Sequence, residues 1–160
     1  MNHENTNWQQ STAGVCIKDH KVLLARHTYG GGKGKLIIPG GYLEQGELPE
    51  DGVRREFLEE TGITVEPRKL LGIRFNTKDW YVVFAVDYIS GEAVSDHDEN
   101  SEVLWIDTAE ALSREDVPGL TKIMIEKALQ GGSLVNTPYV GGREPYSLYC
   151  ASEEDAHESP

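Results

Sequence analysis

The sequence has no long apolar run. Nowhere in its 160 residues are there about 18 consecutive apolar residues, the length that a helix needs to cross a bilayer. The first residues, Met1 to Asn5, have neither the basic start nor the apolar core of a secretion signal. We therefore expect a protein that binds no membrane and stays in the cytoplasm.

Cysteine and positive charge are also scarce. The two cysteines, Cys16 and Cys150, form no CxxC pair and no zinc-type spacing, so no disulfide is expected in the cytoplasm. Lys and Arg total 15 against 27 Asp and Glu, a net charge of −12. Because proteins that bind a nucleic-acid polymer normally present a Lys/Arg face, this charge argues against such a partner. A small phosphorylated substrate stays compatible with it.

Nothing in the sequence indicates covalent catalysis. No Ser-His-Asp or Cys-His arrangement is recognisable, and the five histidines are scattered. We interpret His20 and His27 as solvent or turn residues. The chemistry must therefore come from other groups.

The pattern of elements predicts an α/β fold. We expect strands at 14–17, 22–25, 36–38, 64–76, 80–89 and 103–106, and helices at about 48–60 and from 118 to about 130. Strands interleaved with helices predict a mixed sheet between helices. No repeat or linker divides the chain, so one domain should cover residues 1–150, with an acidic disordered tail at 151–160.

Residues 131–149 form an arm beyond the last predicted helix. The arm is broken by Gly and Pro but carries large apolar and aromatic side chains, namely Tyr139, Val140, Tyr146, Leu148 and Tyr149. Such a composition is unusual for a free tail. We expect the arm to pack on the body or on a second subunit, and a homodimer is the favoured outcome.

Three glutamates give the most informative pattern in the chain. Glu56, Glu59 and Glu60 stand at i, i+3 and i+4, which places them on one face of a helix. Because like charges at this spacing repel, a cation between them would stabilise the arrangement. Carboxylate oxygens favour hard ions, so Mg²⁺, with Mn²⁺ as a substitute, is the expected metal.

The surroundings of these glutamates distinguish them from a solvated acidic helix face. A Pro39-Gly40-Gly41 turn precedes the helix, and Gly62 is placed to cap its end. The predicted buried side of the helix consists of Leu48, Val53, Phe57 and Leu58. Arg55 precedes the cluster, and its guanidinium fork is suited to hold the carboxylate of Glu47.

Together, Gly41 to Ile63 resemble the signature of the Nudix hydrolases. That signature is Gly, five residues, Glu, seven residues, Arg-Glu, an apolar residue, any residue, Glu-Glu, any residue, Gly and an apolar residue, and every fixed position is filled. A looser resemblance runs from about Gly14 to Leu129. It implies an α/β/α sandwich with a mixed sheet, and metal-dependent cleavage of a nucleoside diphosphate linked to another group.

The resemblance also implies roles for single residues. The metal ligands would be Glu56, Glu59 and Glu60, with the carbonyl of Gly40 added. Glu59 and Glu60 are the foremost candidates. Glu47 would orient or support the nucleophilic water, and Arg55 would hold the glutamates in place.

An acidic segment, Asp96 to Glu102, supplies one further candidate. In many Nudix enzymes a loop carboxylate before a late strand acts as general base or additional ligand, and here Glu99 is the first choice and Glu102 the second. The alternative is an exposed acidic loop, because local spacing does not place such a carboxylate. A calcium loop is excluded, since Ser101 stands where that loop needs Gly and Asp107 where it needs Glu.

The substrate is open at this point. The first candidate activity is a nucleoside triphosphate pyrophosphohydrolase (MutT-like), and the second is an ADP-ribose, nucleotide-sugar or dinucleoside polyphosphate hydrolase. A non-catalytic nucleotide-sensing Nudix domain is a third possibility, although a pure sensor has no use for an intact ligand set. Phe75, Trp80 and Tyr81 are candidates for stacking on a base. Strand alternation puts Trp80 and Tyr81 on opposite faces, so at least one should belong to the core.

Overall fold

Strand β1 (Gln9–Lys18) is the centre of the sheet, and its middle residues are buried on both faces. Ala13 and Val15 contact one hydrophobic cluster, and Cys16 contacts another. This alternation follows from the two-residue period of a strand. The computed structural model describes residues 9–75, 79–136, 138 and 149–151.

The sheet is mixed, as the sequence predicted. Its other strands are β2 (Lys21–His27), β3 (Leu36–Ile37), β4 (Gly40–Tyr42), β5 (Thr64–Phe75), β6 (Asp79–Ser90), β7 (Asn100–Asp107), β8 (Leu134–Asn136) and β9 (Tyr149–Ala151). β1 runs antiparallel to β2 and β4 but parallel to β6. β5 continues the sheet beyond β6, and β3 and β7 pair with β2.

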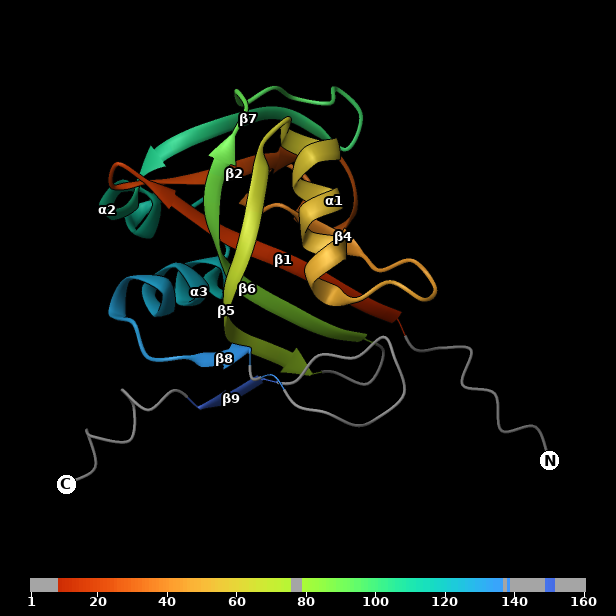
Figure 1. Ribbon diagram of the computed structural model, residues 1–160. Helices are drawn as coiled ribbons and strands as arrows, with labels where there is room; N and C mark the ends of the chain where they lie inside the picture. Colours follow the sequence, from red (N-terminus) through yellow and green to blue (C-terminus); the bar gives the residue numbers. More distant parts are fainter. Residues whose placement is uncertain (1–8, 76–78, 137, 139–148, 152–160) are drawn as a thin grey trace.

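Helices cover both faces of this sheet (Figure 1). They are α1 (Pro49–Thr61), α2 (Thr108–Ser113) and α3 (Gly119–Gln130), and a short 3-10 turn, η1 (Gly30–Gly32), follows β2. A Cβ on Gly14 would lie 2.8 Å from Phe57 of α1, and one on Gly72 would lie 3.1 Å from Met124 of α3. The chain is therefore an α/β/α sandwich. None of the described helices is long and apolar enough to span a bilayer.

The ends of α1 lie within one residue of the predicted bounds. Pro49 occupies the first turn, where its missing N–H is harmless. Gly62 adopts a left-handed φ of 75° and donates its N–H to the carbonyl of Leu58 at 3.1 Å. The prediction that Leu58 is buried was wrong, because this side chain is 57% exposed. It lies about 100° around the helix from Phe57, which is fully buried.

Several short elements were not predicted, among them β4 and α2. β4 contains Gly40 and Gly41, which have low strand propensity, and its pairing with β1 defines it as a strand. α2 is too short to show a helical period. The side chain of Asp107 caps it by accepting the N–H of Ala109 at 3.0 Å.

The described parts of the arm pack on the body. β8 pairs with β5, and β9 pairs with β8, which extends the sheet by two strands. The ring of Tyr149 meets that of Phe84 edge-on, with centroids 5.6 Å apart, in the cluster beneath α1. Residues 139–148, and residues 152–160 of the tail predicted at 151–160, lie outside the described residues. The disordered tail and the homodimer stay predictions.

The packing of Tyr149 leads to a stability prediction. Tyr149→Ala should lower the free energy of unfolding by about 2 kcal/mol, below the 3–5 kcal/mol typical of a fully buried aromatic residue because Tyr149 is half-buried. Urea unfolding measures this loss. Ile89→Ala, an exposed apolar residue of β6, is the control and should change stability by less than about 0.5 kcal/mol. Equal stability of the two variants would mean that the arm contributes nothing.

Candidate active site

The guanidinium of Arg55 joins the loop before α1 to the helix itself. Its Nε and Nη2 donate to the two carboxylate oxygens of Glu47 at 2.8 and 2.9 Å. This two-point geometry is the pairing that the sequence predicted. The hydrogen bonds from Arg55 hold the pKa of the Glu47 carboxyl below its usual range. Glu47 is therefore ionised at neutral pH.

The same guanidinium reaches two carboxylates of α1. Its Nη1 donates to Glu56 at 3.0 Å and to Glu59 at 3.2 Å, and its Nη2 donates to the backbone carbonyl of Tyr42 in β4 at 3.1 Å. One cation thus links a loop, a strand and a helix. The roles of Arg55 and Glu47 in catalysis stay predictions.

Three carboxylates form a cluster beside this guanidinium. Glu56 and Glu60 come from α1, Glu99 comes from the loop before β7, and one oxygen of each lies within 4.8 Å of the others. Glu56 and Glu60 are only 7% and 5% exposed, whereas Glu99 is exposed. A Cβ on Gly41 would lie 2.6 Å from Glu56 Oε1. This position therefore needs glycine to let the carboxylate approach the strand.

Burial changes the acidity of the two helix glutamates. Burial, with the nearby carboxylate of Glu56 adding to it, raises the pKa of Glu60 from 4.5 to about 10. Burial also raises the pKa of Glu56, although Arg55 opposes this shift. The N–H of Gly40 donates to Glu60 at 3.3 Å, but among the described residues no Lys or Arg forms an ion pair with Glu60. The cluster has more negative charge than its surroundings compensate.

This donor set fits a hard divalent cation. All three side chains offer carboxylate oxygens, which Mg²⁺ and Mn²⁺ prefer over softer ligands. Gly40, whose carbonyl the Nudix resemblance adds as a ligand, lines the same cavity. A cation among these oxygens would favour the ionised form of Glu60 against the burial and the nearby Glu56 carboxylate that raise its pKa.

Glu59 lies outside this group of three. Its side chain is 59% exposed and pairs with Arg55. The helical spacing predicted one face for all three glutamates, but that face is divided. Glu56 and Glu60, four residues apart, point to the sheet, whereas Glu59 is displaced by about 100° from Glu60. Its role as a metal ligand stays a prediction.

Hydrogen bonds order the loop that carries Glu99. Asp96 Oδ1 accepts the backbone N–H groups of Asp98 and Asn100 at 2.9 and 3.0 Å. Thr28, after β2, donates its N–H to the carbonyl of Glu99 at 3.1 Å and its hydroxyl to that of Asp98 at 2.6 Å. The loop is therefore a folded turn that directs Glu99 toward α1.

Glu102, the second choice for the loop carboxylate, is placed elsewhere. It accepts a hydrogen bond from Arg26 Nε at 2.9 Å in a network that includes Asp116. The structure thus brings Glu99, and not Glu102, to the helix glutamates. Whether Glu99 acts as base or ligand stays a prediction.

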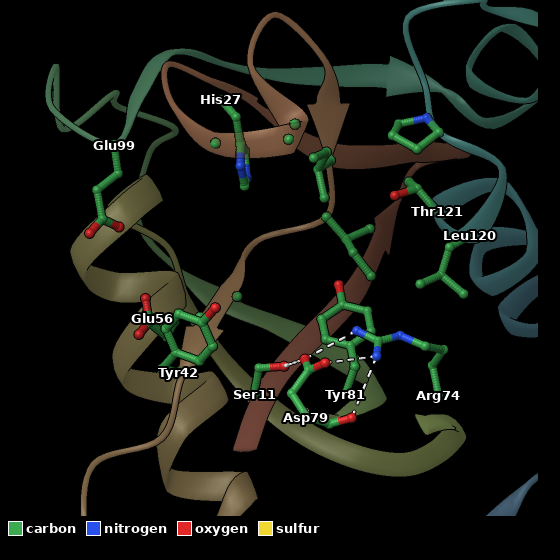
Figure 2. A pocket seen from close by; sticks show the side chains of 18 of the residues that line it. Ser11, His27, Tyr42, Glu56, Arg74, Asp79, Tyr81, Glu99, Leu120 and Thr121 are labelled. Carbon is green, nitrogen blue, oxygen red and sulfur yellow. Dashed lines mark hydrogen bonds and ion pairs between the residues drawn. The ribbon is translucent and has the colours of Figure 1, made fainter. Parts of the chain in front are cut away.

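Glu56 and Glu99 lie at one end of a cavity of about 630 Å³. Figure 2 shows Glu56 and Glu99 on one side and Arg74, Leu120 and Thr121 on the other. Leu120 and Thr121 belong to the first turn of α3, so the cavity extends from α1 toward the start of α3. Its volume lies within the roughly 300–1,000 Å³ typical of small-molecule sites.

A second charged pair lines the far end of the cavity. Arg74 donates to the two oxygens of Asp79 at 2.9 and 3.1 Å, and Ser11 donates its hydroxyl to Asp79 at 3.3 Å. The guanidinium carbon of Arg74 lies 5.6 Å from the centre of the Tyr81 ring. Sequence reasoning missed Asp79 and Ser11. The two-residue period of β6, which puts Asp79 and Tyr81 on one face, was the available signal.

Two aromatic predictions are now resolved. Tyr81 lines the cavity and packs against the core, whereas Trp80 on the opposite face contacts Phe75 edge-on at 5.1 Å. The alternation was therefore predicted correctly. The interpretation of His27 as a solvent or turn residue was wrong. It ends β2, lines the cavity and stacks on Tyr29 with ring centres 6.1 Å apart.

Comparison with known proteins agrees with this geometry. The model of the NUDIX domain matches residues 8–126. The chain belongs to the Nudix family. It is similar over 86 residues, at 37% identity, to an ADP-ribose pyrophosphatase of Methanocaldococcus jannaschii, covering 49% of this chain and 50% of that protein.

Two further similarities extend this comparison of the Nudix chain. An NAD-capped RNA hydrolase NudC of Photobacterium profundum is 30% identical over 135 residues, covering 78% of this chain and 49% of that protein. The chain thus spans about half the length of both curated relatives. A crystal structure of a NUDIX hydrolase from Nitrosomonas europaea superposes with a TM-score of 0.71 at 22% identity, covering 80% of this chain and 76% of that one. At this identity the likeness establishes the fold alone.

Proposed function

We propose that this Nudix chain is a Mg²⁺- or Mn²⁺-dependent hydrolase that cleaves the diphosphate linkage of a small nucleotide. The observation that carries the proposal is the group formed by Glu56, Glu60 and Glu99 at one end of a cavity of nucleotide size. A pure nucleotide sensor would have no use for three converging carboxylates. Hydrolysis is the function that this arrangement supports best.

Glu56, Glu60 and Glu99 would hold the cation, with the Gly40 carbonyl as a further ligand, and the resemblance keeps Glu59 as an additional candidate. A bound Mg²⁺ supplies charge neutralisation of the diphosphate and lowers the pKa of a water molecule. Glu47, fixed and ionised by its pairing with Arg55, would orient the attacking water. Glu99, the exposed member of the group, would accept the proton of that water.

The cavity supports a mononucleotide as substrate. With the diphosphate at the carboxylates, the base lies toward Tyr81 and the Arg74–Asp79 pair, which offer a ring and polar groups of both kinds. A nucleoside triphosphate is therefore the first candidate substrate. ADP-ribose is the second, because a relative that is 37% identical is named an ADP-ribose pyrophosphatase. The name of the NudC relative adds NAD-capped RNA, although the net charge of −12 disfavours a polymer.

A substrate panel tests the proposal. Nucleoside triphosphates, ADP-ribose, dinucleoside polyphosphates, NADH, coenzyme A and NAD-capped RNA are incubated with the protein and Mg²⁺ or Mn²⁺, and phosphate-containing products are separated by chromatography. We expect one nucleotide class to be cleaved at its diphosphate and cleavage to stop in excess chelator. Cleavage that persists in chelator would contradict the metal-dependent mechanism, and no cleavage with any compound would contradict hydrolysis of these substrates.

A further inference from the structure

Asn100 links the two segments that carry Glu60 and Glu99. It is the first residue of β7 and is 1% exposed, and its Nδ2 donates to the backbone carbonyl of Glu60 at 2.9 Å. It also directly follows Glu99 in the chain. One buried side chain therefore links the end of α1 to the loop that carries the third carboxylate.

The backbone of Asn100 is fixed as well. Its N–H donates to Asp96 at 3.0 Å, and its carbonyl accepts the hydroxyl of Ser95 at 3.0 Å. These bonds leave the turn little freedom to move relative to the Asn100 side chain. The turn that carries Glu99 is therefore bonded to the backbone of Asn100, while the amide of the same residue bonds to Glu60.

The hydrogen-bonding groups of Asn100 are not all used. Its Oδ1 is buried and has no hydrogen-bond partner among the described residues. A half-satisfied buried amide is a poor choice for a strand that needs only to fill space, since a buried polar atom without a partner costs stability. The Nδ2 bond to Glu60 is the feature of this side chain that an apolar residue would not provide.

We propose that Asn100 is a positioning residue that holds Glu99 against Glu60 so that the three carboxylates bind one cation together. This inference rests on the proposed function, because it assigns a support to the same metal group. Residues that orient metal ligands through hydrogen bonds commonly affect metal affinity by about 10–100-fold when they are replaced.

The simpler alternative is that Asn100 only caps α1. The last carbonyls of a helix have no partner within the helix, and Glu60 has one of these carbonyls. Thr61 also stabilises this helix end, by donating its hydroxyl to the carbonyl of Phe57 at 2.6 Å and accepting the N–H of Ile63 at 3.2 Å. Thr61→Val removes this support without touching the Glu99 loop. It is therefore a matched control for stability.

The test is a double-mutant cycle read out as Mn²⁺ affinity by calorimetry, beside kcat and melting temperature. Asn100→Ala should weaken Mn²⁺ binding by about 10–100-fold. Thr61→Val should change the Mn²⁺ affinity by less than about twofold, even if it lowers the melting temperature as much as Asn100→Ala does. In a protein that already carries Glu99→Gln, Asn100→Ala should weaken Mn²⁺ binding further by no more than about twofold. This is the error expected when the effects of independent sites are added.

Two results for Asn100→Ala would overturn the proposal. Unchanged Mn²⁺ affinity in Asn100→Ala, or the same loss with and without Glu99, would leave Asn100 as a cap. If Asn100→Ala does not fold, Asn100→Leu carries the same test, because it keeps the volume and removes the donor. A wild-type protein that binds no Mn²⁺ would refute the proposed function as well, whereas normal wild-type binding with an unaffected variant refutes only the role of Asn100.

Discussion

Glu60→Gln should abolish hydrolysis while leaving the protein folded. The change keeps the size of the side chain and removes one of the two buried charges that the cation needs. Losing a ligand that neutralises the diphosphate should cost on the order of 10³-fold or more in kcat, since charge stabilisation of this kind is typically worth several kcal/mol. Steady-state assays at saturating substrate, together with circular dichroism, measure both parts.

The same variant should be more stable than the wild type when no cation is present. Burial raises the pKa of Glu60 from 4.5 to about 10, so its contribution to stability is greatest below pH 4.5 and is lost as the pH rises toward 10. Cation-free Glu60→Gln should therefore melt above the wild type at pH 8, and the difference should shrink toward pH 5. Mn²⁺ at about 100 times its Kd should stabilise the wild type by roughly 2.7 kcal/mol but should not stabilise the variant in this way.

Glu92→Gln is the control for both measurements, because Glu92 is exposed and outside the cluster. It should keep wild-type turnover and the full stabilisation by Mn²⁺. Wild-type turnover in Glu60→Gln would remove Glu60 from the mechanism and refute the assignment of the cluster.

The family resemblance and the structure differ on the role of Glu59. The resemblance makes it a foremost ligand, yet its carboxylate pairs with Arg55 and is not in the group of three. A loss of turnover in Glu59→Gln as large as that in Glu60→Gln would mean that Glu59 turns to the cation when it binds. A mild loss would mean that Glu59 acts through Arg55.

Sequence reasoning succeeded where interacting residues lie close to one another in the chain. The helix at 49–61, its glycine cap and the Arg55–Glu47 pair all lie within one short stretch of chain, where few partners compete. The carboxylate of Glu99 lies about forty residues further on, and only the family resemblance pointed to it. No local rule gave its approach to Glu60, because that approach depends on the pairing of β7 with β2 and on the turn at Asp96.

The far end of the cavity was also largely missed. Arg74 of β5 and Asp79 of β6 are five residues apart in the chain and pair across neighbouring antiparallel strands. Ser11 joins them because β1 lies parallel to β6. The first turn of α3 then closes this end. This end of the cavity thus depends on strand pairing, whereas Arg55, Glu47 and the helix glutamates lie within one stretch of chain. This explains why the sequence predicts the chemistry better than the substrate.

Glu99→Gln should reduce kcat by about 10²–10⁴-fold, the range for losing a general base, whereas Glu102→Gln should stay within about twofold of the wild type. The reason is placement. Glu99 lies within 4.8 Å of both helix glutamates, whereas Glu102 is paired with Arg26 at 2.9 Å. Both substitutions remove one negative charge from the same acidic loop and its strand, so their comparison cancels any effect of net charge.

The Mn²⁺ dependence of Glu99→Gln then distinguishes the two roles of this carboxylate. If Glu99 is a ligand, as its position in the group of three favours, the variant should need more Mn²⁺ for half-maximal activity. If Glu99 acts only as a base, affinity should be unchanged and the rate should lose its dependence on the ionisation of that base across the pH range. Wild-type turnover in Glu99→Gln with a large loss in Glu102→Gln would show that the loop carboxylate had been assigned to the wrong residue. Wild-type turnover in both would assign water activation to Glu47 or to a helix glutamate.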